Sequence, residues 1–246
     1  MIQTFIVCHD PRVIDHYEKN GHYSYLSNYK YILVGQADYA ESDKVIIARN
    51  LPVNIEDKKN LLVYTAWYAI IENNLASEKY VRLLEYDTII SDDIESRSIT
   101  MIHQKESNIG VWGHFPYHMN SYHFIQNPEW IESLDIAMKQ VYNTSIQDLV
   151  QNSNKILDRW MGTSNILFKI EEMKAFVEWY KPLAELVYQD PKAGHGLERA
   201  LTFFCLHQNK PYHFIENALQ HYQLNSHGTQ QAGDYEENVK KILWKN

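Results

Sequence analysis

The residues of this sequence whose types and spacing best suit chemistry are Glu85 and Asp87, two carboxylates one residue apart. They follow an apolar run that begins at Tyr80, and apolar residues resume at Ile89 and Ile90. This pattern predicts a buried strand that carries both acids to a sheet edge on one face, because strand residues i and i+2 share a face. Paired anions cost free energy unless a cation or hydrogen-bond donors offset them.

An oxygen-only pair suits Mg²⁺ or Mn²⁺, which bind one or two carboxylates and complete their shell with substrate phosphates. We therefore predict a divalent-metal site of the kind that holds a nucleoside diphosphate, with Glu85 and Asp87 as ligands and Tyr86 as a nucleotide contact. The alternative is a solvated turn or helix start, where most acid-x-acid triplets occur. The flanking Val81 and Leu83 favour the buried strand.

Polar residues also follow two earlier strand-like runs. His9 and Asp10 come directly after the apolar run 4–8, and Arg49 follows the run 45–48. Open α/β sheets bind ligands beyond the carboxyl ends of their strands, so all three residues are candidate nucleotide contacts. An ordinary strand-exit turn, which the pair Asp10 and Pro11 favours, is the alternative for the first two.

The elements that must position these residues alternate along the chain. Helical periodicity is clearest after residue 54, where six residues recur at intervals of three and four: Leu61, Tyr64, Thr65, Tyr68, Ile71 and Leu75. Strands are expected at 4–8, 31–35, 45–48, 80–90, 108–113, 160–168 and 211–215. Helices are expected within 12–28, at 54–74, at 128–142, at 171–188 with a bend at Pro182, and from 194 onward. The order predicts an α/β fold with a mixed central sheet flanked by helices.

No repeat or Gly/Ser linker divides the chain, so we expect a single domain over residues 1–246. Within it we expect a nucleotide-sugar-binding half at 1–107, an acceptor-side half at 108–223 and a C-terminal tail at 224–246. The 246 residues are long enough for one substantial core.

Composition excludes several classes of protein. The net charge of −8 and a pI near 5.8, without a basic stripe, argue against nucleic acid as a partner. Cys8 and Cys205 form no disulfide framework and are expected to be small core residues in a reducing compartment. No apolar run is long enough to cross a membrane, so a cytoplasmic protein is expected.

Three histidines in an aromatic loop, His114, His118 and His123, raise the alternative of a zinc site. Their spacings of four and five residues span Pro116, which breaks the helix that would bring them onto one face. Zinc is therefore not the expected metal.

Motifs in the middle and at the end of the chain resemble a known family. Thr65 to Tyr68 with Asn73, the run 163–168 that contains Asn165, and Glu198 with Arg199 resemble the helix, strand and Glu-Arg signatures of bacterial polysaccharide glycosyltransferases with a DUF4422-type domain. This similarity covers about residues 60 to 215.

The triplet Glu85-Tyr86-Asp87 stands where small GT-A-type glycosyltransferases carry an Asp-x-Asp metal motif. Glu85 replaces the first Asp of that motif and still offers oxygen ligands. The triplet is not, however, the motif of DUF4422-type domains, so metal dependence stays open.

The resemblance implies a GT-A-like, Rossmann-type domain in which Thr65, Tyr68, Asn73 and Asn165 bind the donor. It implies a hexosyl- or deoxyhexosyltransferase of polysaccharide biosynthesis that moves a sugar from a nucleoside diphosphate, with UDP slightly favoured, to a saccharide acceptor. The reaction would be inverting and assisted by Mn²⁺ or Mg²⁺. A glycoside hydrolase with paired carboxylates and a non-catalytic sugar- or nucleotide-binding module are the alternatives.

Two further residues complete the expected site. Glu198 lies at an expected helix start, away from the apolar stripe of that helix, and is the expected general base toward the acceptor. His227 lies in a small polar segment near the C-terminus, where many GT-A enzymes close a mobile segment with a His on the metal or diphosphate. A surface histidine in a flexible tail is the alternative for His227.

Overall fold

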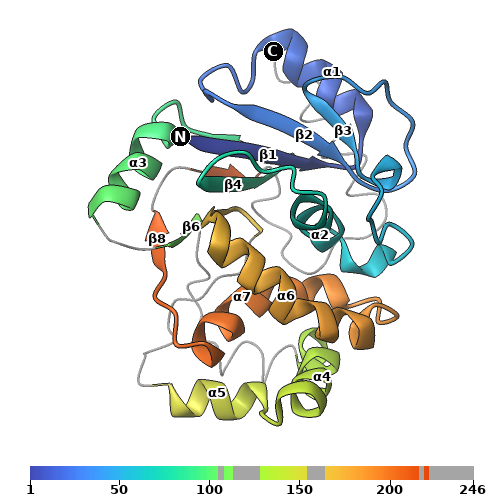
Figure 1. The fold of residues 1–246 in the computed structure, drawn as a ribbon, viewed down its shortest axis with the longest axis vertical. Helices are drawn as coiled ribbons and strands as arrows, with labels where there is room; N and C mark the ends of the chain where they lie inside the picture. Colours follow the sequence, from blue (N-terminus) through green and yellow to red (C-terminus); the bar gives the residue numbers. More distant parts are fainter. Residues whose placement is uncertain (105–107, 113–127, 154–163, 216–218, 222–246) are drawn as a thin grey trace.

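The computed structural model describes residues 1–104, 108–112, 128–153, 164–215 and 219–221. Its centre is a seven-stranded sheet in the order β3-β2-β1-β4-β7-β6-β8 (Figure 1). The strands of this sheet are β1 (Ile2–Cys8), β2 (Tyr29–Leu33), β3 (Val45–Ile47), β4 (Tyr80–Glu85), β6 (Ile109–Trp112), β7 (Ile166–Lys169) and β8 (His213–Ile215). The fold is thus α/β with a mixed sheet, as the sequence predicts.

The described helices connect these strands and cover both faces of the sheet. They are α1 (Pro11–Asn20), α2 (Tyr64–Glu72), α3 (Ile94–Gln104), α4 (Glu132–Tyr142), α5 (Ile146–Asn152), α6 (Ile170–Val187) and α7 (Ala193–His207), with short 3-10 turns η1 (Ala48–Asn50), η2 (Lys59–Leu61) and η4 (Pro128–Trp130). In the part of the chain that the structure describes, none of these helices has the length and apolarity that a membrane span requires.

The strand pairing creates a reversal of strand order at β1. β1 pairs in parallel with β2 on one side and with β4 on the other, whereas β4 pairs antiparallel with β7. The strands that follow β1 in the chain, β2 and β3, are therefore added on one side of β1, and the chain then crosses to add β4 on the other side. Crevices at such reversals, beyond the carboxyl ends of the strands, are where open α/β sheets bind ligands.

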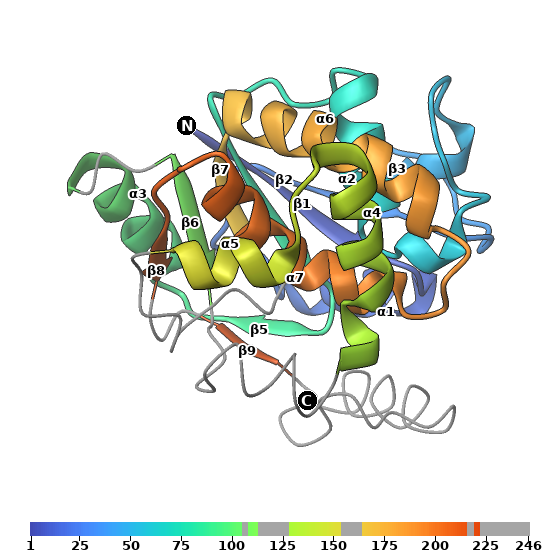
Figure 2. The same cartoon turned by 90° about the horizontal axis from the view of Figure 1, so that it is seen from below.

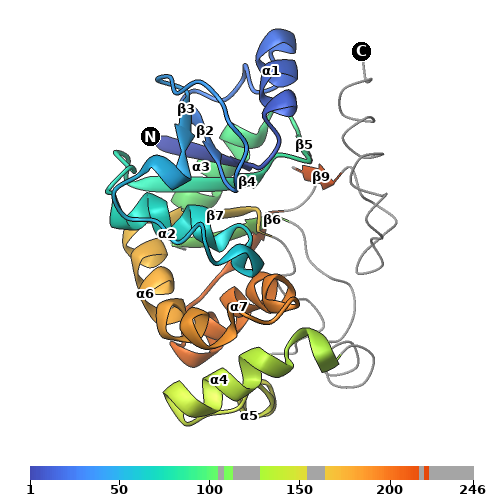
Figure 3. The ribbon, with the colours of Figure 1, turned by 90° about the vertical axis from the view of Figure 1, so that its right-hand side faces the viewer.

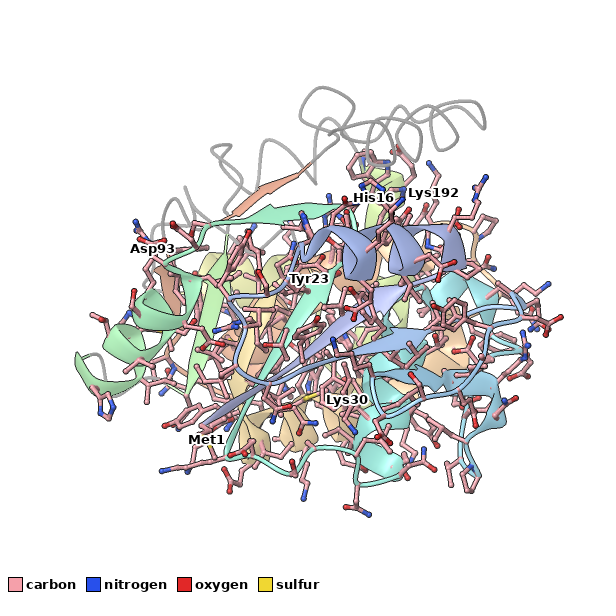
Figure 4. All side chains as sticks on the ribbon, turned by 90° about the horizontal axis from the view of Figure 1, so that it is seen from above. Met1, His16, Tyr23, Lys30, Asp93 and Lys192 are labelled. Carbon is pink, nitrogen blue, oxygen red and sulfur yellow. The ribbon has the colours of Figure 1, made fainter. Side chains whose placement is uncertain are left out.

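Side chains of β1 alternate between two cores on opposite faces of the sheet. Phe5 and Val7 pack with α2, α6 and α7, and Ile6 and Cys8 pack with α1 and α3. Figure 3 shows these layers edge-on, with α4 and α5 forming an outer layer beyond α6 and α7. Figure 4 shows Tyr23 in the interior beside α1, on the second face, and Asp93 at the periphery.

A buried arginine ties β4 to α3. The Arg82 side chain is fully buried, and its guanidinium donates to Glu95 at 3.1 Å, to Ser98 Oγ at 2.8 Å and to Thr4 Oγ1 at 3.1 Å. Burial lowers the pKa of Arg82, and the charge of Glu95 opposes that shift. The pair holds α3 against the sheet.

The acidic triplet is the place where the structure differs most from the expected strand at 80–90. β4 ends at Glu85, residues 86 and 87 form a turn, and β5 (Thr88–Ile90) leaves the main sheet to pair antiparallel with β9 (Leu219–His221). Figure 2 shows this two-stranded sheet apart from the main one. The run of β-prone residues from 80 to 90 does not indicate where the turn lies. That β5 belongs to a second sheet follows only from its pairing with the distant strand β9.

Most other expected elements are present with shifted ends. The helix expected at 54–74 begins only at Tyr64, after the turn η2, and α2 is buried on more than one side. α5 has no counterpart among the expected helices, and Pro182 lies inside α6, which continues to Val187. Cys8 and Cys205 are buried and not joined in a disulfide, as expected. The division into donor and acceptor halves stays a prediction.

Candidate functional site

A cavity of about 560 Å³ lies at the reversal of strand order, beyond the carboxyl ends of β1, β2 and β4. Its wall also includes the segment around η2 and the start of α2. The lining residues are Val7, His9, Val34, Gly35, Gln36, Glu56, Lys59, Leu62, Val63, Thr65, Glu85, Tyr86 and Asp87. All three residues of the acidic triplet therefore face one cavity, although a turn rather than a continuous strand brings them there.

Asn165, just before β7, holds Glu85 in place. The Asn165 side chain is buried, its Oδ1 accepts a hydrogen bond from the Glu85 backbone N–H at 2.9 Å, and its Nδ2 donates to Glu85 Oε2 at 3.4 Å. The Thr88 hydroxyl also donates to Asn165 Oδ1, at 3.4 Å. Asn165 is not among the described residues that line the cavity, so it orients the acidic turn rather than facing the cavity.

The backbone of Tyr86 is fixed from two sides. Its N–H donates to the Val7 carbonyl at 3.1 Å, and its carbonyl accepts from the Tyr17 hydroxyl at 2.7 Å. The Tyr86 ring meets the His9 ring edge-on, with centroids 4.9 Å apart. The turn that carries Glu85 and Asp87 is thus held rigidly by β1 and α1.

His9 and Asp10, adjacent in sequence, have different surroundings. His9 lines the cavity, where desolvation lowers its pKa while the charges of Asp10 and Asp87 oppose the shift. Asp10 is buried at the N-terminus of α1, where its carboxylate accepts from the Arg12 backbone N–H at 3.0 Å and pairs with the Arg12 guanidinium. Asp10 therefore caps α1, a role that neither the predicted nucleotide contact nor the alternative of a plain strand-exit turn included.

Of the other expected donor contacts, only Thr65 lines the cavity. Arg49 donates to the Ala37 carbonyl and pairs with Asp38, and Asn73 exchanges hydrogen bonds with the backbone of Val53. Tyr68 lies beneath the Lys181 ammonium group. Among the described residues, these three brace loops or pack in helices outside the cavity wall.

The cavity has an unbalanced charge. Among its described lining residues three are acidic, Glu56, Glu85 and Asp87, and one, Lys59, is basic. An anionic diphosphate would be repelled here unless a cation came with it. The described residues contain no group of three or more His, Cys, Asp or Glu side chains that could hold a metal by themselves.

Glu198 lies in the first turns of α7 and is not among the described lining residues of the cavity. Its carboxylate pairs with the guanidinium of Arg199, which is buried, donates to the His195 carbonyl at 2.9 Å and lies over the Trp130 ring. Glu198 is one helical turn from Gly194 on the same face.

Gly194 brings α7 against the cavity wall. A Cβ at this position would lie 2.2 Å from Leu62 Cδ1, so no larger residue fits without displacing Leu62. Since Leu62 lines the cavity, the start of α7 packs against the cavity wall at Leu62.

Four expected residues lie outside the described part of the chain: His114, His118 and His123 of the zinc alternative, and His227 of the C-terminal segment. Their roles stay predictions.

Sequence reasoning missed the segment that closes the cavity, from Glu56 to Val63. The sequence analysis assigned these residues to the helix expected at 54–74, whereas they form loops and the 3-10 turn η2, and α2 begins only at Tyr64. The one available signal is Glu56 itself, an acid at the start of the expected helix, where an ordinary capping role accounts for it equally well.

No protein-family model matches this chain, and no curated protein matches its sequence. A solved structure is similar to it: the apo form of the bifunctional glycosyltransferase WbbM, with a TM-score of 0.59 and 12% sequence identity over 89% of this chain. The match covers 45% of the WbbM chain, so this chain spans less than half of that enzyme's length. This chain shares its fold with the matched part of WbbM.

Proposed function

We propose that this protein is a glycosyltransferase that moves a sugar from a nucleoside diphosphate donor to a saccharide acceptor in polysaccharide or other glycan synthesis. The observation that carries the proposal is the cavity at the strand-order reversal, with Glu85 and Asp87 at one end. The fold shared with WbbM agrees with this proposal, although a fold alone does not fix an activity. We favour UDP slightly as the nucleotide.

The acidic turn fits a divalent ion that binds together with the donor. Two carboxylates are the usual protein share of a Mg²⁺ or Mn²⁺ site that substrate phosphates complete, and the excess of acids over Lys59 calls for such a cation. Asp87 would hold the ion, with Glu85 binding directly or through water. When bound, the ion supplies Lewis-acid stabilisation of the charge on the leaving diphosphate.

The chain's own residues would position and deprotonate the acceptor. Glu198 takes the proton of an acceptor hydroxyl. The oxygen of that hydroxyl bonds to the anomeric carbon of the donor sugar, and the bond from this carbon to the diphosphate breaks. Arg199 keeps the Glu198 carboxylate in place through their ion pair. Attack from the face opposite the leaving group gives an inverted product.

The test is a thermal shift experiment on the purified chain with UDP, GDP, dTDP and CMP species, each with Mn²⁺, with Mg²⁺ or with a chelator. A ligand at about 100 times its Kd stabilises a protein by about 2.7 kcal/mol, which gives a visible shift. We expect one nucleotide to stabilise the protein and the chelator to reverse this effect. Donor turnover, measured as nucleotide release in the presence of saccharides, then separates an enzyme from a binding module.

A glycoside hydrolase would behave differently in the same samples. It needs two carboxylates about 5 to 10 Å apart and no nucleotide. Hydrolysis of a glycan without any nucleotide sugar, together with no response to the nucleotides, would contradict the proposal.

A further inference from the structure

Glu56 is a buried carboxylate in the cavity wall to which the proposed reaction gives no role. It lies in the loop between η1 and η2, its residue is 5% exposed, and it lines the cavity. Acidic residues are rarely buried to this extent without a partner for each oxygen.

One oxygen of Glu56 is fixed by the end of β2. The Gly35 backbone N–H donates to Glu56 Oε2 at 2.5 Å, and Gly35 has a φ of +81°, a conformation that suits glycine. The loop itself is fixed by Asn54, whose amide donates to the carbonyls of Arg49 and Leu51. Glu56 is therefore held in one orientation by backbone contacts.

The other oxygen has no partner among the residues that the structure describes. Glu56 Oε1 is buried and accepts no hydrogen bond from any described residue, and no described Lys or Arg forms an ion pair with this carboxylate. A buried acceptor without a donor is costly, so such an oxygen is expected to receive one from a ligand or a water molecule. Its place in the wall of the cavity favours a ligand.

The position of Glu56 along the cavity indicates which part of the ligand it meets. Strands β2, β1 and β4 are adjacent in that order, so the end of β2 and the end of β4 are two strand spacings, about 10 Å, apart. The acids at the end of β4 would take the metal and the diphosphate. A nucleotide bound there would extend across the end of β1 to Gly35, Gln36 and Glu56, which line the same cavity.

We propose that Glu56 recognises the nucleoside part of the donor by accepting a hydrogen bond at Oε1. The donor group is an N–H of the base or a hydroxyl of the ribose, which present the same chemistry to a carboxylate. This inference rests on the proposed function, and it assigns nucleotide selection to a residue outside the acidic turn.

The test compares Glu56→Gln with the parent by calorimetric titration of UDP, GDP, dTDP and CDP, each with Mn²⁺, and of inorganic pyrophosphate with Mn²⁺. Glutamine keeps an acceptor for the Gly35 N–H but offers an NH₂ group where a base N–H needs an acceptor. We expect the nucleotide that binds the parent to bind the variant about 10 to 100 times more weakly. Pyrophosphate should bind both equally, because it reaches only the acidic turn.

Two probes separate the sources of the hydrogen bond. If a ribose hydroxyl donates to Glu56, ribose 5-phosphate also binds the variant more weakly than the parent. If a base N–H donates, ribose 5-phosphate binds both alike and the loss is confined to complete nucleotides.

Controls keep the outcomes distinct. Glu41→Gln, an exposed acid that accepts from Asn50 outside the cavity wall, should bind every probe as the parent does. Glu56→Asp, which withdraws the carboxylate, serves in place of the glutamine variant if the latter does not fold. Parental affinity of the Glu56 variant for a nucleotide that binds the parent overturns this inference alone. Failure of the parent to bind any of the nucleotides overturns the proposed function.

Discussion

Glu85 and Asp87, at the β4–β5 turn, line a cavity together with Glu56, and Lys59 is the single basic residue among the described lining residues. Glu95 and Glu198, in contrast, are each paired with a buried arginine. The arginine partners also differ. Arg82 comes from β4 while Glu95 comes from α3, so that pair joins two elements. Arg199 is adjacent to Glu198 in the same helix, so their pair joins nothing and only orients the carboxylate.

This contrast indicates what each carboxylate is for. The cation that pairs with Glu95 is Arg82, and this pair holds the fold together. The cation that pairs with Glu198 is Arg199, and this pair orients the Glu198 carboxylate. At the cavity the lining residues leave an excess of negative charge, which a ligand and its cation can balance. Substitutions at the three places should therefore affect catalysis, stability and ligand binding separately.

The largest effect is expected from Glu198→Gln. As the proposed general base, Glu198 would act mainly in the transition state, so kcat should fall by about 10² to 10⁴-fold while donor binding survives. The measurement is kcat and donor Kd, with Glu185→Gln, an exposed partner of Lys58, as the control that keeps parental rates. A variant that retains more than about a tenth of parental kcat would return Glu198 to a structural role at the start of α7.

The next effect is on stability, from Glu95→Ala. The change leaves the guanidinium of Arg82 buried without its counter-charge, which costs about 3 to 5 kcal/mol of the free energy of unfolding. Urea unfolding measures this loss. Glu171→Ala, which removes a surface pair with Lys169, should cost much less. Similar losses in both variants would show that the Arg82 pair does not join α3 to the sheet.

The third effect, from Asp87→Asn, is confined to the liganded state. The variant should lose the stabilisation of about 2.7 kcal/mol that a nucleotide with Mn²⁺ confers at 100 times its Kd. Without ligand it should be no less stable than the parent, since it removes one of the crowded anions. Thermal shifts with and without Mn²⁺ test both points. Melting of the free variant well below the parent would make Asp87 a structural residue.

The smallest effect is on the decrease of stability at low pH. It separates the contribution of the histidines to this decrease from that of the carboxylates. His22 stacks on Tyr17, with centroids 4.0 Å apart, and burial lowers its pKa from 6.5. As pH falls below 6.5, the unfolded chain binds a proton that the folded chain does not, so stability decreases.

Replacing His22 by Phe keeps the ring stack and should flatten this decrease by at most about 1.4 kcal/mol per pH unit. Urea unfolding between about pH 5 and pH 7 measures the slope. The same slope is measured for His207→Phe, because burial also lowers the pKa of His207. An unchanged slope for the His22 variant would assign the acid sensitivity to other groups.

The sequence predicted the parts of the site that depend on continuous buried strands. β1 and β4 are apolar runs that end in polar residues, and this pattern alone places His9, Glu85 and Asp87 at one sheet edge. The resemblance indicated Asn165, although its side chain holds the acidic turn instead of lining the cavity.

The parts that were not predicted depend on contacts between distant segments. The turn at residues 86 and 87 is fixed by Val7 and Tyr17, and no local pattern reports those bonds. The position of Glu56 is fixed by Gly35, in a loop that the sequence analysis assigned to a helix. Propensity describes single segments, whereas these geometries arise only when several segments meet.

The pairing of β5 with β9 limits how the chain can be shortened. β9 ends at His221, which lies opposite Thr88 in the register. A chain cut before Leu224 keeps this pairing, so a rise in the donor's apparent KM would report on the missing tail, where His227 lies. A chain cut after Ile215 would instead leave β5 as an unpaired edge of N–H and C=O groups, which recruits strands from other molecules. Self-association is therefore the expected first symptom of the shorter truncation, before any loss of catalysis can be measured.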